Sequence, residues 1–266
     1  MLRCQISKLR QLNSAHTRSL IDQIQQQGFG LVSIDDSGLL RGLQVALQEA
    51  KVLKGFRFPP MEEVPIQYNE EKRLAFRSLF SVATTSLNAI ISTTPKNAEN
   101  ERMANLDRLR EAIRESEASP LFANSPHEPF QDGQHFSQTF FNLFNYNNGL
   151  LNPHVDRSLL TVIFSAKQNK KDQSSSLWIE NPHTKQWVNS DEIKDDNQVI
   201  IMVGDELPTS AMDYLDLNAA QHAVKVDPQG EKLSNAHFRP DPLTPKDDQN
   251  RLSAAIILRH DDLEEV

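Results

Sequence analysis

The first 118 residues show the spacing of apolar and polar positions that is typical of amphipathic helices. Asn13 or Ser14 can cap the first helix, and Gly28 follows its end. Leu20 and Ile24 share the apolar side of that helix. Arginine and glutamate crowd the fourth helix at spacings that favour surface ion pairs, which indicates a solvated face. The pattern therefore predicts four helices, over residues 13–27, 39–53, 70–92 and 98–117.

From about residue 119 the pattern changes to short apolar or alternating runs, separated by residues that favour turns. One similar run, 28–34, lies within the helical part. Residues 231–250 are polar, carry three prolines and are expected to form a long insertion loop. Residues 56–65 are expected to form a shorter loop. The other predicted strands are 137–146, 159–164, 199–203, 220–226 and 252–258, with turns at 147–149, 167–172, 181–185 and 227–230.

Several short strands at this spacing are typical of an all-β sandwich or jelly roll. We therefore predict an α+β protein that has a double-stranded β-helix (jelly-roll) core and a helical N-terminal layer. The helical region is expected over residues 1–118 and the core over residues 119–266. Because 266 residues suit one large domain, the two regions are expected to pack as one structural unit.

The composition narrows the classes of partner. A formal net charge of −8 argues against nucleic-acid binding, which needs a basic surface. The apolar runs are shorter than a membrane span requires, so a membrane partner is not expected. Cys4 is the only cysteine, which excludes an intrachain disulfide and a thiolate cluster. A metal would therefore be held by histidine, aspartate or glutamate.

A His-x-Asp pair, His154 and Asp156, directly precedes the apolar run 159–164. Alternate residues of an extended segment share a face, so both side chains can point to one side. Two histidines and one carboxylate are the ligands of many non-haem iron(II) oxygenases. His260 and Asp262 have the same spacing, but no histidine follows them to complete such a set.

The third ligand and an anion-binding pair are expected on later strands. His222 lies in an alternating run and can face the interior, although an inward histidine on a strand is more often a core residue. Arg251 and Ser253 open the last apolar run and share a face. A guanidinium and a hydroxyl together can bind a carboxylate.

The ordered motifs resemble the isopenicillin N synthase-like 2-oxoglutarate- and iron(II)-dependent oxygenases. The resemblance rests on the sequence from Phe141 to Phe164 with its His-x-Asp pair, on Val203-Gly-Asp205 before the distal histidine, and on Arg251-x-Ser253-x-Ala255. Leu20 to Ile34 also resembles the first helix and strand of that family.

The resemblance implies that His154, Asp156 and His222 bind Fe(II), and that Arg251 and Ser253 bind the distal carboxylate of 2-oxoglutarate. Tyr146 is implied as a further contact to this cosubstrate, supported by Asn145. It further implies a dioxygenase that hydroxylates a small-molecule substrate with O2 and releases succinate and CO2, with ascorbate as an optional further requirement. We expect such an enzyme to be monomeric.

Two departures from the family pattern concern the segments around the expected site. The family usually has Asn-Tyr-Tyr-Pro where residues 145–148 are Asn-Tyr-Asn-Asn. The insertion 231–250 also lengthens the segment between His222 and Arg251, and we expect it to cover the site.

Three other functions stay open at this point. One is an Fe(II) oxidase that does not use 2-oxoglutarate, and another is a non-catalytic binding protein on a decayed oxygenase fold. The third is a zinc hydrolase with the same ligands, although no motif supplies its base. Residues 1–21 are basic and lack acids, as mitochondrial presequences do. Because the resemblance begins at residue 20, we expect a cytoplasmic protein, with a mitochondrial location as the alternative.

Overall fold

A computed structural model describes residues 2–52, 70–94, 101–118, 136, 139–146, 151–166, 175–226 and 251–260. The predicted loop 56–65, the insertion 231–250 and the turns at 147–149, 167–172 and 227–230 lie outside these residues. The turn predicted at 181–185 is present between two strands.

Helices α2 to α5 correspond to the four predicted helices. The Asn13 side chain caps α2 by accepting from the backbone N–H groups of Ala15 and His16, and Gly28 follows its last residue. Three short helices were not predicted, because each is shorter than the window in which helical periodicity can be recognised. The helices are α1 (Ile6–Arg10), α2 (Ser14–Gln27), α3 (Ser37–Val52), α4 (Glu70–Ser92), α5 (Glu101–Ala118), α7 (Ser190–Ile193) and α8 (Thr209–Leu215).

The strands form two sheets. In the larger sheet every neighbouring pair is antiparallel except β1 and β2, and the smaller sheet is antiparallel throughout. The larger sheet has the order β1 (Cys4–Gln5), β2 (Gly30–Ser33), β8 (Gln198–Val203), β5 (Leu160–Ser165), β10 (Arg251–Leu258) and β3 (Phe140–Tyr146). The smaller sheet has the order β4 (Leu151–His154), β9 (His222–Val226), β6 (Ser175–Glu180) and β7 (Trp187–Asn189).

Strands β3, β5, β8, β9, β10 and β2 correspond to predicted strands, whereas β1, β4, β6 and β7 were not predicted. Strand β4 contains Pro153, which cannot donate a ladder hydrogen bond. It lies at the edge of the smaller sheet, the position at which a strand tolerates proline. Because of this proline, the sequence pattern did not predict the strand that carries His154.

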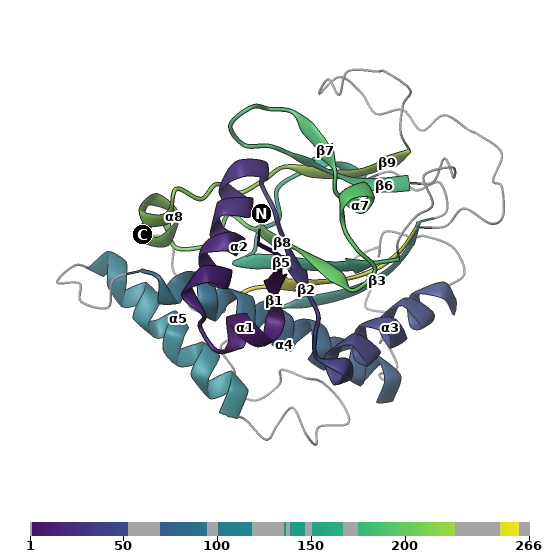
Figure 1. The fold of residues 1–266 in the computed structure, drawn as a ribbon, viewed down its shortest axis with the longest axis horizontal. Coiled ribbons are helices and arrows are strands. Elements are labelled where there is room, and N and C mark those ends of the chain that lie inside the picture. The colour runs from purple at the N-terminus through teal and green to yellow at the C-terminus, as the bar shows by residue number, and fades with distance from the viewer. Residues whose placement is uncertain are drawn as a thin grey trace.

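The larger sheet is buried on both faces (Figure 1). On β10, Ala254 and Ile256 belong to the core shared with the helices, and Ala255 belongs to a second core shared with the smaller sheet. Helices α3 and α4 contact β10 on the first of these faces. The alternation on β10 places Arg251 and Ser253 on the same side as Ala255, between the two sheets. Within the described residues these sheets form an open sandwich and do not close into a barrel.

Contrary to the expectation that the apolar runs are too short, helix α4 is long and apolar enough to cross a membrane, but most of it is buried inside the protein. It packs against α3, α5, β5 and β10. At Gly42 of α3 an added Cβ would lie 2.8 Å from the Cβ of Ser78 on α4, so the two helices approach closely at this point. The burial of α4 is therefore that of a core helix.

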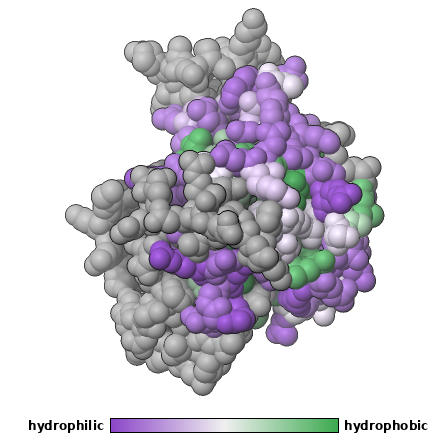
Figure 2. Space-filling view, turned by 90° about the vertical axis from the view of Figure 1, so that its left-hand side faces the viewer, coloured by the Kyte–Doolittle hydropathy of each residue, from purple (hydrophilic) through white to green (hydrophobic). Residues whose placement is uncertain are grey.

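Helix α5 is only partly the solvated helix that its charges predicted. Arg114 and Glu111 form an ion pair on the surface, as expected. Arg110 instead turns inward, and its Nη2 donates to the carbonyl oxygen of Ile91 at 2.9 Å and to the Thr94 hydroxyl at 2.6 Å. It thereby caps the C-terminal end of α4. On the described surface near α5 and α8, hydrophilic residues predominate and hydrophobic ones form small separate patches (Figure 2).

Candidate metal centre

Two histidines face each other where the edge of the smaller sheet ends. His154 is the last residue of β4 and pairs in register with His222, the first residue of β9. Their imidazole rings are 4.2 Å apart between centroids. The register shifts between Leu151 and His154, so a bulge precedes the histidine pair. Such irregularities re-aim side chains next to functional sites.

Asp156 completes the group. Its carboxylate oxygens lie 3.3 Å from Nε2 of His154 and 3.4 Å from Nε2 of His222. One ligand atom from each of the three residues lies within 4.8 Å of the other two. Among the residues that the structure describes, this is the only group of three or more potential metal ligands.

Hydrogen bonds from the surroundings orient His154 and Asp156. Nδ1 of His154 lies 2.8 Å from the carbonyl oxygen of Asn152, which places the ring proton on Nδ1 and leaves the Nε2 lone pair for the site. Thr161 donates a hydrogen bond of 2.6 Å to Oδ2 of Asp156. Threonine and carbonyl partners of this kind hold metal ligands in place.

The segment after β8 holds the loop that carries Asp156. The backbone N–H of Asp205 donates to the carbonyl oxygen of Asp156, and that of Glu206 donates to the carbonyl oxygen of Ser158. A Cβ on Gly204 would lie 2.2 Å from the Ser158 carbonyl oxygen. Glycine at this position therefore permits the close approach of the two loops.

Burial and the neighbouring charges favour a neutral His222 and an ionised Asp156, the forms in which both residues bind metals. Burial lowers the pKa of His222 to about 4, despite the attraction of Asp156. Burial opposes ionisation of Asp156, but hydrogen bonds from His154 and Thr161 and the attraction of both histidines hold its pKa below the usual value. Burial likewise opposes protonation of His154, but its contact with Asp156 raises its pKa overall. At neutral pH the group therefore offers an imidazole lone pair on His222 and an ionised carboxylate.

This arrangement suits a divalent transition metal. Two imidazole nitrogens and one carboxylate can occupy one face of an octahedron, which is the ligand set of non-haem Fe(II) sites. The His222 side chain is 6% exposed and that of Asp156 12%, whereas that of His154 is 36% exposed. The group is therefore open to solvent on the His154 side.

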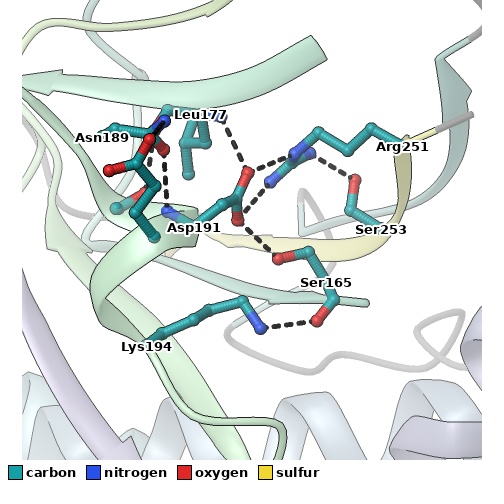
Figure 3. Close-up of polar contacts among 9 residues, drawn as sticks. Ser165, Leu177, Asn189, Asp191, Lys194, Arg251 and Ser253 are labelled. Carbon is teal, nitrogen blue, oxygen red and sulfur yellow. Dashed lines mark hydrogen bonds and ion pairs between the residues drawn. The ribbon is translucent and has the colours of Figure 1, made fainter. Parts of the chain in front are cut away.

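The predicted anion-binding pair lies between the sheets (Figure 3). Arg251 and Ser253 are buried, and Nη1 of Arg251 donates to the Ser253 hydroxyl at 2.9 Å. The structure adds a residue that sequence reasoning missed. Asp191, in the first turn of α7, accepts from Nε of Arg251 at 2.7 Å and from Nη2 at 3.3 Å. The guanidinium is thus paired with a buried carboxylate of the protein.

For Tyr146 and Asn145, the two further predicted contacts to 2-oxoglutarate, the structure describes only the backbone. Tyr146 pairs with Arg251 and Asn145 pairs with Leu252 across β3 and β10. The other histidine with a His-x-Asp spacing, His260, packs edge-on against Phe136, and Asp262 lies outside the described residues.

Thr161 and Asp191 had no specific sequence signal. Thr161 resembles any β-branched residue of a buried strand, and Asp191 resembles any acid in a first helical turn. Their contacts depend on strand pairing and on the approach of the two sheets, which local spacing does not reveal.

Sequence comparison with models of protein families and with curated proteins gives no match. Comparison of structures does give matches. A protein from Shewanella oneidensis provisionally assigned as an oxygenase is similar with a TM-score of 0.54 and 14% identity, over 98% of this chain and 90% of that chain. A protein from Caulobacter crescentus provisionally assigned to the 2-oxoglutarate–Fe(II) oxygenase family is similar with a TM-score of 0.52 and 12% identity, over 98% and 86%. The chain therefore has the fold of these two assigned oxygenases, and its His-Asp-His group could bind iron.

Proposed function

We propose that the protein is a 2-oxoglutarate- and Fe(II)-dependent dioxygenase that hydroxylates a small organic substrate. The observation that carries this proposal is the convergence of His154, Asp156 and His222 from two strands and one loop. Their ligand types would leave the opposite coordination positions for a cosubstrate and O2. We further propose the isopenicillin N synthase-like branch, because Arg251 and Ser253 repeat its Arg-x-Ser pair on the last strand.

Strand β6 connects the metal-ligand group with the buried pair of Arg251 and Asp191. Asp191, the partner of Arg251, accepts a hydrogen bond from the N–H of Leu177 on β6. Leu177 is two residues along β6 from Ile179, which pairs with His222. Two residues advance about 6.6 Å along a strand. The positions of the two groups along β6 support one small cosubstrate that contacts both.

The proposed reaction balances without a further reductant. A substrate C–H bond, O2 and 2-oxoglutarate give a C–OH group, succinate and CO2, with one oxygen atom in the hydroxyl group and the other in succinate. Bound iron would supply the redox chemistry that activates O2. The residues of this chain would hold the metal through His154, Asp156 and His222. Arg251 and Ser253 would bind the distal carboxylate, which orients the cosubstrate.

The first test is metal-dependent binding of 2-oxoglutarate. Mn(II), which is redox-silent here, should raise the melting temperature, and 2-oxoglutarate should raise it further, because ligands that bind the native state stabilise it. His154→Ala should lose both shifts. His183→Ala, in the exposed turn between β6 and β7, is the matched control and should keep them.

The second test is turnover. With Fe(II) and O2, screening of metabolite pools for succinate release should identify substrates for the wild-type protein and none for His154→Ala. Oxidation of a substrate in the absence of 2-oxoglutarate would instead identify an Fe(II) oxidase. A wild-type protein that shows no metal-dependent stabilisation would be a non-catalytic protein on this fold.

A further inference from the structure

Asp191 is an acid whose side chain is enclosed between the two sheets. Strand β7 ends at Asn189, whose side chain accepts from the N–H of Asp191 and so begins α7. The turn carries the Asp191 carboxylate back to β6, where it accepts from the N–H of Leu177 at 2.8 Å. Asp191 is 2% exposed. An ionised group at such a depth is costly unless it is paired and fully hydrogen-bonded.

The donors to Asp191 come from both sheets (Figure 3). Besides Leu177 of the smaller sheet, Ser165 of β5 donates to Oδ1 at 2.8 Å, and Arg251 of β10 donates through Nε and Nη2. Burial alone would raise the pKa of Asp191, but the charge and the hydrogen bonds of Arg251 hold it below the usual value. The carboxylate is therefore ionised at neutral pH and ties the two sheets together at this end.

These contacts determine how the guanidinium of Arg251 is turned. Because its Nε and Nη2 edge faces Asp191, its Nη1 lies on the side of Ser253. Ser253 is also directly opposite Ser165 in the β5–β10 ladder. One serine of this pair thus holds Asp191, and the other meets Arg251. Lys194, which donates to the carbonyl oxygen of Ser165 at 2.6 Å, supports the same strand.

We propose that Asp191 is a positioning residue that fixes the orientation of Arg251, so that Nη1 and the Ser253 hydroxyl bind the distal carboxylate of 2-oxoglutarate. This inference rests on the proposed function. Asp191 would raise the affinity and the selectivity of the protein for a 2-oxo acid that has a second carboxylate. It would not affect the binding of the metal. A guanidinium held in one orientation loses less side-chain entropy when it binds an anion.

The negative charge of Asp191 could also weaken the binding of 2-oxoglutarate, because it competes with the ligand carboxylate for Arg251. The test must distinguish this effect from positioning. If Asp191 only competed with the ligand carboxylate for Arg251, its removal would strengthen the binding of 2-oxoglutarate. If it positions Arg251, its removal weakens this binding. The two roles therefore predict changes of opposite sign.

The test compares two ligands of equal length on the Mn(II)-loaded protein. 2-Oxoglutarate has a distal carboxylate, and 2-oxopentanoate has the same five-carbon chain without it. Dissociation constants are measured by calorimetry and by ligand-dependent melting. For Asp191→Asn we expect binding of 2-oxoglutarate to weaken about tenfold or more, the scale for loss of an outer residue that orients a binding group. Binding of 2-oxopentanoate and of Mn(II) should change less than twofold, so the preference for the diacid falls.

Two further variants guard against a general loss of stability. Ser165→Ala removes one donor to Asp191 but keeps the ion pair, and it should lower the preference by a smaller factor even if Asp191→Asn does not fold. Gly42→Ala disturbs the α3–α4 contact on the opposite face of the larger sheet and should leave the preference unchanged.

Two other results would overturn the inference. An unchanged or increased preference for the diacid in Asp191→Asn and Ser165→Ala, with 2-oxoglutarate still bound by the wild type, refutes the positioning role and leaves the proposed function standing. A wild-type protein that binds Mn(II) but shows no preference for 2-oxoglutarate refutes both.

Discussion

His154 and His222 are 68 residues apart in the sequence, yet they pair in register across β4 and β9 with ring centroids 4.2 Å apart. Asp156 approaches Nε2 of both rings. The hydrogen bonds around this group lead to predictions on how the metal site is supported, and the buried ion pairs and helix caps lead to predictions on stability.

Thr161→Val should weaken metal binding. The substitution keeps the shape of the side chain and removes the hydrogen bond of 2.6 Å to Oδ2 of Asp156. Loss of such a partner typically lowers metal affinity by about 10- to 100-fold. Titration of Mn(II) by calorimetry measures the change. Thr17→Val, which removes a buried hydroxyl on α2, is the matched control, and an equal loss in both variants would contradict the role of Thr161.

Gly204→Ala should disturb the loop that carries Asp156. The added methyl group would lie 2.2 Å from the carbonyl oxygen of Ser158 and 2.8 Å from that of Asp156, so the two loops must separate. We expect a loss of about 1–3 kcal/mol of stability, the usual cost of overpacking, together with weaker Mn(II) binding. Urea unfolding and metal titration check the two effects. Gly38→Ala, near the exposed start of α3, should change neither, and a Gly204→Ala protein with unchanged metal affinity would refute the prediction.

Asp191→Asn should destabilise the metal-free protein in a pH-dependent way. The pKa of Asp191 is lower in the folded protein than its ordinary value of 3.8, so its contribution to stability is present above that value and is lost as the pH falls through the folded pKa. At neutral pH the variant should be less stable by about 3–5 kcal/mol, because a buried arginine loses its charged partner.

The difference between wild type and Asp191→Asn should narrow once the pH falls below 3.8, because the Asp191 carboxyl of the unfolded wild-type chain then takes up a proton while that of the folded chain is still ionised. Urea unfolding of both proteins at a series of pH values measures this difference. A constant difference down to acid unfolding would show that the charge of Asp191 does not contribute.

Arg110→Met should cost more stability than Arg114→Met, although both arginines lie on α5 and pair with an acid three residues earlier. Arg110 also binds Ile91 and Thr94 at the end of α4, so we expect a loss of about 1–3 kcal/mol when these acceptors lose a charged donor. The exposed pair of Arg114 should contribute below about 1 kcal/mol. Thermal unfolding of the two variants measures the contrast, and equal losses would contradict the cap.

The sequence by itself determined the four long helices, six of the strands and the candidate ligands. Helical and strand periodicities depend on which local faces are apolar, and these can be seen from spacing alone. His154, Asp156, His222, Arg251 and Ser253 were identified by residue type and by their order before or within apolar runs.

Only the tertiary structure decided which residues support them. Strand β4 contains a proline, and β6 begins in a run of serines, so neither has the pattern of an ordinary strand. Asp191 meets Arg251, 60 residues later, because the end of β7 turns into the space between two sheets. Such contacts depend on strand order, register and the distance between layers. They are set by packing over the whole chain, and the local spacing of apolar and polar residues carries no record of them.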